Sequence, residues 1–179
     1  MRIFTAIEIP EEIKGRIASI APEFDIDGVT LVRKAQLHIT LHFLGEMADD
    51  RIEPLESAIS THKFSRFEVN LKGLSCFSPT KPRIIFVGIG KNADKISSVY
   101  LALAGTLVKG GFYPMRNPYV PHATIARVKG SADSGTLIRL IKKYSTYDFG
   151  TYEVSSLSLK KSTLTGSGPV YEELYKLEF

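Results

Sequence analysis

The sequence contains no tryptophan and a single cysteine, Cys76, among its 179 residues. One cysteine excludes an intramolecular disulfide and is too few for a structural zinc site, which fits a reducing compartment. No hydrophobic run approaches the roughly 20 residues that a membrane-spanning helix needs. The first residues reach the acid Glu8 too early for a secretory signal peptide. We therefore expect a cytoplasmic protein with no membrane partner.

Hydrophobic residues make up 44% of the chain and charged residues 23%, as in an ordinary globular protein. A chain of this length has enough material for one core, so we expect residues 1–179 to form a single domain. The net charge of +4 is uneven: residues 1–90 hold 11 basic and 12 acidic residues, and residues 91–179 hold 12 and 7. A basic C-terminal half suits an anionic partner such as RNA, but charge alone fits a solvated surface equally well.

Three short patterns recur in the same order with offsets of 82, 84 and 85 residues. They are Ile3-Phe4-x-x-Ile7 with Ile85-Phe86-x-x-Ile89, Leu37–Leu41 with Pro121–Ile125, and Phe67-Glu68-Val69 with Tyr152-Glu153-Val154. This order indicates an internal duplication and a bilobal α+β fold with two pseudo-symmetric lobes. We expect two antiparallel sheets with helices on their outer faces, enclosing a central cleft. Hydrophobic periodicity predicts helices in the ranges 10–24, 49–61, 94–109 and 132–144.

Two of the four histidines begin a His-x-Thr pattern, His38 with Thr40 and His122 with Thr124. Side chains alternate along a strand, so each histidine shares a face with its threonine while the apolar residue between them points to the other face. A pair of imidazoles can supply the base and the acid that phosphate-ester cleavage needs, and hydroxyls can hold the phosphate oxygens. The chain shows no phosphate-binding glycine loop and no carboxylate-rich metal cluster, which favours acid–base chemistry without a metal or cofactor. The alternative is that each histidine only binds a backbone carbonyl on an exposed strand.

Two longer stretches contain these motifs: Leu37-His38-Ile39-Thr40-Leu41-His42-Phe43-Leu44-Gly45-Glu46 and Pro121-His122-Ala123-Thr124-Ile125-Ala126-Arg127-Val128. They resemble the two signatures of the 2H phosphoesterase superfamily. Within it, the chain is most similar to the RNA 2′,3′-cyclic phosphodiesterases, also called 2′-5′ RNA ligases. The resemblance extends over most of the chain. It implies metal-independent hydrolysis of RNA 2′,3′-cyclic phosphate ends to 2′-phosphates, with reverse 2′-5′ ligation as a second reaction. The implied partners are RNA ends, tRNA fragments among them, and the protein is expected to be a monomer.

The resemblance also implies roles for individual residues. His38 would protonate the departing 3′ oxygen, and His122 would activate water. Thr40 and Thr124 would hold the phosphate. Arg127 matches a basic position that could contact phosphate or RNA, although strict alternation puts it on the face opposite His122.

Several points stay open in the sequence. His42 shares the alternation of His38, so it is either a third ring in the cleft or a surface residue on the substrate side. Relatives often have a tryptophan before the first motif; here Phe43, Tyr113 or Tyr119 could stack on a base instead. The substrate could also be a small cyclic phosphate derived from a nucleotide or ADP-ribose, or the protein could bind RNA ends without turnover.

Overall fold

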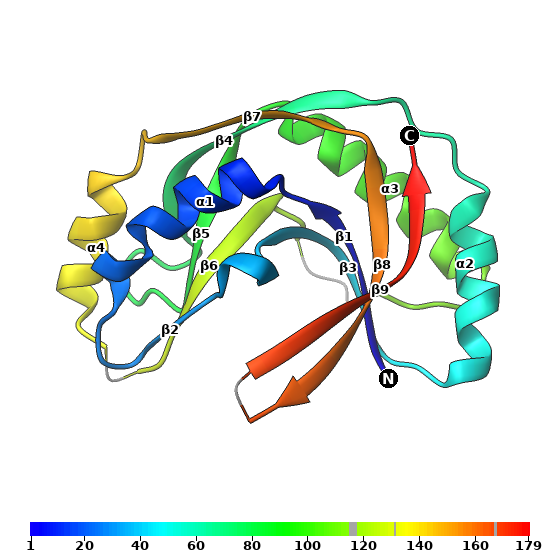
Figure 1. Ribbon diagram of the computed structural model, residues 1–179, viewed down its shortest axis with the longest axis horizontal. Helices are drawn as coiled ribbons and strands as arrows, with labels where there is room; N and C mark the ends of the chain where they lie inside the picture. Colours follow the sequence, from blue (N-terminus) through cyan, green and yellow to red (C-terminus); the bar gives the residue numbers. More distant parts are fainter. Residues whose placement is uncertain (115–117, 131, 167) are drawn as a thin grey trace.

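The computed structural model describes residues 1–114, 118–130, 132–166 and 168–179. These residues form one curled, antiparallel, nine-stranded sheet with helices beside each half (Figure 1). The strands are β1 (Arg2–Glu8), β2 (Val29–Leu31), β3 (His38–Glu46), β4 (Phe67–Cys76), β5 (Ile84–Lys91), β6 (His122–Val128), β7 (Asp148–Val154), β8 (Ser156–Thr165) and β9 (Gly168–Glu178). The α+β class is confirmed.

The strand order is β7-β4-β5-β6-β3-β1-β8-β9, with β2 paired to β6. The prediction of two separate sheets is wrong for the described residues, because β3 and β6 pair with each other at Ile39 and Ala123. Both residues are fully buried. Pairing the two strands removes what would otherwise be two exposed edges with unpaired backbone groups. The two motif strands are therefore neighbours at the centre of one sheet and do not face each other across a gap.

The strand order is similar on the two sides of the β3–β6 pair, with β1, β8 and β9 following β3 on one side and β5, β4 and β7 following β6 on the other. β1 and β5, which carry the first recurring pattern, both lie next to a motif strand. The third pattern behaves differently: its two copies lie in β4 and β7, which pair directly, with Phe67 opposite Val154. The internal duplication stays a prediction.

The four expected helices are confirmed as α1 (Glu11–Ile20), α2 (Ile52–Ser60), α3 (Ala93–Lys109) and α4 (Ser134–Lys143). α1 and α4 lie beside one half of the sheet, and α2 and α3 beside the other (Figure 1). The longest helix, α3, buries a stripe of apolar residues, Ile96, Val99, Leu103 and Leu107. Within the described ranges, no helix is both long enough and apolar enough to span a membrane.

Candidate active site

The pairing of β3 with β6 brings the two His-x-Thr motifs onto one face of the sheet. Because Ile39 lies opposite Ala123 in an antiparallel register, His38 comes next to Thr124, and Thr40 comes next to His122. Alternation then points all four side chains to the face opposite the buried Ile39 and Ala123. The four side chains are half-buried. The structure thus brings together the four residues that the sequence singled out, in adjacent strands.

Both imidazoles are oriented in the same way by the backbone. His38 Nδ1 lies 2.7 Å from the carbonyl oxygen of Gln36, and His122 Nδ1 lies 2.6 Å from that of Val120. A carbonyl can only accept, so Nδ1 carries the hydrogen and Nε2 is left for other partners. In His38, Nε2 lies 2.9 Å from Thr40 Oγ1. Each ring therefore does bind a backbone carbonyl, but only through one nitrogen.

Aromatic rings surround each histidine. Phe4 and Tyr171 lie 5.1 and 5.3 Å from the ring centre of His38. Phe86 and Phe77 lie 4.9 and 5.1 Å from that of His122. These contacts reduce the access of water to both rings, which disfavours the charged imidazolium.

The pKa of both imidazoles is accordingly low. Burial lowers the pKa of His38 to about 4, while the bond to Gln36 and the negative charge of Glu8 act in the opposite direction. Burial also lowers the pKa of His122, the bond to Val120 acts against this, and the positive charge of Arg127 adds to the lowering. Both rings are neutral bases at neutral pH unless a bound anion favours their protonated forms.

A β-bulge interrupts the alternation in each motif strand. In β3, Thr40 lies opposite Ala6 and His42 opposite Thr5, so Leu41 is an extra residue against β1. In β6, the same shift against β5 makes Ile125 the extra residue, between Thr124 and Ala126. An extra residue shifts the side chains that follow it to the other face, and in β3 a second extra residue, Leu44, comes after Phe43.

We call the face of the sheet that carries His38, Thr40, His122 and Thr124 the motif face. The bulge in β3 moves the His42 side chain away from this face. Its side chain is 2% exposed, and its ring stacks on Tyr100 of α3 with centres 4.2 Å apart. Neither ring nitrogen has a hydrogen-bond partner among the described residues, and burial lowers the pKa of His42 to about 4. Both readings of His42, as a third cleft ring or as a surface residue, are therefore wrong.

The same bulges bring Arg127 and Phe43 to the motif face. Arg127 is exposed, and its charge acts on both His122 and Tyr171. Phe43 is 50% exposed, and its ring centre lies 6.1 Å from that of Phe4, beside His38. Strict alternation placed Arg127 on the wrong face, because a bulge is a property of the paired strand and leaves no mark in the repeat of apolar residues.

The sequence analysis did not single out Glu8, which lies opposite His38 in the β1–β3 register. Its carboxylate contacts Lys160 of β8 and lies 3.4 Å from Lys14 Nζ of α1. Burial acts to raise the pKa of Glu8, but the two lysines outweigh it and leave that pKa below its ordinary value. Glu8 therefore places a partly buried cluster of opposite charges beside the first motif. Only the strand register reveals it, because its partners are distant in sequence.

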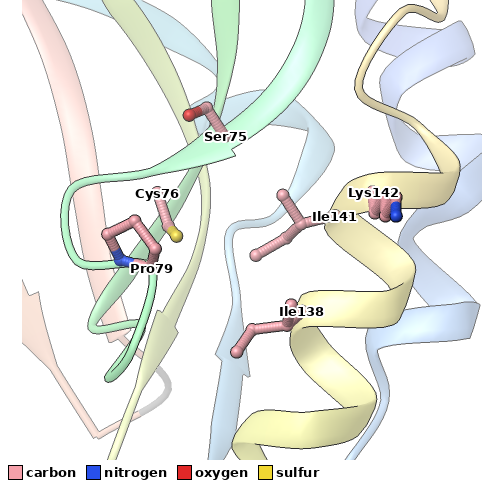
Figure 2. Close-up of a pocket in the computed structure, with 6 residues that line it drawn as sticks. All are labelled: Ser75, Cys76, Pro79, Ile138, Ile141 and Lys142. Carbon is pink, nitrogen blue, oxygen red and sulfur yellow. The ribbon is translucent and has the colours of Figure 1, made fainter.

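Two hollows in the surface are lined by none of the four motif side chains. Figure 2 shows one of about 190 Å³ between α4 and the end of β4, lined by Ser75, Cys76, Pro79, Ile138, Ile141 and Lys142. A second, of similar size, is lined by Glu8 and Tyr152 among others. In the part of the chain that the structure describes, no three His, Cys, Asp or Glu side chains are grouped so that they could hold a metal ion.

Comparison with known proteins agrees with this geometry. The family model described as LigT like Phosphoesterase matches residues 7–86 and 88–171. The chain belongs to the LigT-like phosphoesterase family. This LigT-like phosphoesterase is 38% identical over 173 residues to a protein of Methanocaldococcus jannaschii named RNA 2′,3′-cyclic phosphodiesterase, a match covering 96% of this chain and 97% of the relative. A protein of Aeropyrum pernix with the same name is 33% identical over 167 residues, covering 92% and 95%.

The comparison with solved structures shows the same fold. The crystal structure of Escherichia coli LigT without ligand superimposes with a TM-score of 0.79, covering 99% of this chain and 96% of LigT, at 22% identity. That identity supports the fold alone. The resemblance stated from the two His-x-Thr stretches is confirmed at the level of the family.

Proposed function

We propose that this LigT-like phosphoesterase hydrolyses 2′,3′-cyclic phosphate ends of RNA, leaving a 2′-phosphate. The observation that carries the proposal is the joint placement of His38 and His122, each with Nδ1 held by a carbonyl, on one face beside the two motif threonines. The relatives that match along nearly the whole chain bear the name of this activity.

The reaction needs one proton removed and one supplied. Nε2 of His122 takes a proton from the attacking water, whose oxygen forms the new bond to phosphorus. The bond from phosphorus to the 3′ oxygen breaks, and protonated His38 gives its Nε2 proton to that oxygen. Phosphorus stays on the 2′ oxygen. Each step moves one proton, so two imidazoles of opposite protonation state suffice without a metal.

The other motif-face residues act on the phosphate. The hydroxyls of Thr40 and Thr124 donate to the non-bridging oxygens, and Thr40 exchanges its present contact with His38 Nε2 for this one. Arg127 offsets the charge that develops on those oxygens. The anionic phosphate also raises the pKa of His38, so that the ring can be protonated when substrate is bound.

Reverse 2′-5′ ligation is a second reaction of the same groups. In it, a 5′ hydroxyl loses its proton to His122 and attacks the cyclic phosphate, the bond to the 3′ oxygen breaks, that oxygen takes the proton of His38, and a 2′-5′ phosphodiester forms. Exposed aromatic rings support this reaction: Phe43 lies beside the His38 side of the motif face, and Phe77 touches His122, at 50% and 51% exposure. Such rings can each stack on one base, as a substrate with nucleosides on both sides of the phosphate would require.

The test is hydrolysis of an oligoribonucleotide ending in a 2′,3′-cyclic phosphate, in excess EDTA. We expect turnover in EDTA and a 2′-phosphate product, identified by chromatography against 2′- and 3′-phosphate standards. His38→Ala and His122→Ala should each lower kcat by about 10²–10⁴-fold, and the double variant should lose far less than the product of the two losses.

His62→Asn is the matched control, because His62 stacks on Phe64 after the end of α2 and is not part of the motifs. It should keep wild-type turnover. A 3′-phosphate product would contradict the assigned bond cleavage, and loss of activity in EDTA with rescue by a divalent ion would contradict the metal-free reaction. Equal turnover of a mononucleotide cyclic phosphate would favour a small substrate. Tight binding of RNA ends without any product would favour a binding protein.

A further inference from the structure

The two motif strands, β3 and β6, share little backbone pairing with each other at the seam where they meet. Among the described residues, β3 and β6 share one register pair, Ile39 with Ala123. The bulges at Leu41 and Ile125 follow shortly after this pair in each strand. A contact outside this register pair is therefore needed to fix the distance between the two motifs.

Tyr119 makes a second connection across the seam. Its hydroxyl donates to the carbonyl oxygen of Thr40 at 3.1 Å. Tyr119 belongs to the segment that leads into β6, and the next residue, Val120, accepts the hydrogen bond from His122 Nδ1. Two consecutive residues thus contact both motifs: one contacts the backbone of Thr40 and the other the ring of His122.

The orientation of the Tyr119 ring is set by a stack of three rings. Tyr119 lies parallel to Tyr100, with centres 4.0 Å apart and planes 2° apart. Tyr100 lies parallel to His42, at 4.2 Å and 4°. Because Tyr100 comes from α3 and His42 from β3, the stack ties the lead-in of β6 to both elements. Burial raises the pKa of Tyr119, so its hydroxyl remains a donor at neutral pH.

We infer that Tyr119 is a positioning residue that sets the spacing of Thr40 from His122. The inference rests on the proposed function, in which Thr40 holds the phosphate while His122 activates water. Without the hydroxyl, the Thr40 carbonyl loses its link to the His122 segment, and the two motifs can drift apart. A displacement of about 1 Å between reacting groups can cost up to about 10²-fold in rate.

The experiment compares Tyr119→Phe with Tyr100→Phe. Both variants remove one hydroxyl from the same stack and keep its rings, but the structure shows no hydrogen bond from the Tyr100 hydroxyl to any described residue, so only Tyr119→Phe breaks the link to Thr40. We expect Tyr119→Phe to lower kcat on the cyclic-phosphate oligonucleotide about 10-fold, with KM changed less than about two-fold. Tyr100→Phe should keep both constants, and the two variants should melt at the same temperature.

A readout without substrate separates this inference from the proposed function. In Tyr119→Phe, backbone amide hydrogen exchange at Ile39 and Ala123 should accelerate, while Tyr100→Phe should match wild type. Failure of the wild-type protein to hydrolyse the oligonucleotide would reject the proposed function and leave this measurement to decide the link. Unchanged exchange in Tyr119→Phe, or wild-type kcat in an active protein, would overturn the inference. Equal loss of kcat in both variants would overturn it as well.

Discussion

The two histidines share a motif but differ in their charged neighbours. His38 faces Glu8 of β1, with Lys160 of β8 and Lys14 of α1 behind that carboxylate. His122 has Arg127 of its own strand nearby. A carboxylate favours an imidazolium and a guanidinium disfavours one. Glu8 therefore favours the protonated form of His38, and the two lysines oppose it. Arg127 favours the neutral form of His122 that a base requires.

The pH dependence follows from the lowered pKa values. The base must be neutral, so activity rises as pH passes the pKa of His122. The acid must be protonated, so activity falls as pH passes the pKa of His38, about 4 in the free protein. Burial lowers both, so both limbs of kcat/KM should lie below the ordinary imidazole value. Bound cyclic phosphate favours imidazolium, so both limbs of kcat should lie at higher pH.

Steady-state kinetics across the acidic and neutral range checks this order of the limbs. The values belong to the coupled pair and not to either ring alone. His62→Asn should leave both limbs in place, although burial lowers the pKa of His62 too. A flat profile, or limbs of kcat below those of kcat/KM, would mean that these rings do not carry the measured proton transfers.

At the scale of the strand, the bulge in β6 decides what Arg127 can do. Since it faces the same side as His122, replacing it with alanine removes a positive charge that lowers the pKa of His122. That pKa should rise, so the acid limb of kcat/KM should move to higher pH, and KM should increase through the lost phosphate contact. Arg139→Ala in α4 is the control, because Arg139 donates to Thr136 within its own helix. An acid limb that stays in place would put Arg127 outside the site.

At the scale of the whole molecule, ion pairs within the fold neutralise part of the excess positive charge of the C-terminal half. Lys143 pairs with Glu23, Lys160 with Glu8 and Lys161 with Glu172. Among the basic residues outside these three pairs, Arg127 lies near the end of the second motif strand and Lys129 directly follows it. A small number of phosphate contacts near the motifs implies a modest dependence of binding on salt.

We expect KM for an oligonucleotide to rise with salt concentration. For about two to four phosphate contacts, the logarithm of the affinity should fall with the logarithm of the salt concentration at a slope of about −0.7 per contact. A mononucleotide cyclic phosphate, held inside the motif face, should show a much shallower slope. The measurement is KM against salt concentration for both substrates. Equal slopes together with equal turnover would reject the RNA substrate in favour of a small cyclic phosphate.

The sequence by itself determined the family, the four helices and the grouping of each motif histidine with its threonine. The reason is that these features are local: helix periodicity, the two His-x-Thr repeats and strand alternation all lie within a few consecutive residues. Alternation alone correctly grouped His38 with Thr40 and His122 with Thr124, because both bulges come after the threonines.

Only the tertiary structure decided which strands are neighbours and where the alternation breaks. The pairing of Ile39 with Ala123 merged two expected sheets into one. Because of the bulges, the His42 side chain lies against α3 and the Arg127 side chain lies on the motif face. Register and bulges depend on hydrogen bonds between segments far apart in the chain, so no local pattern encodes them.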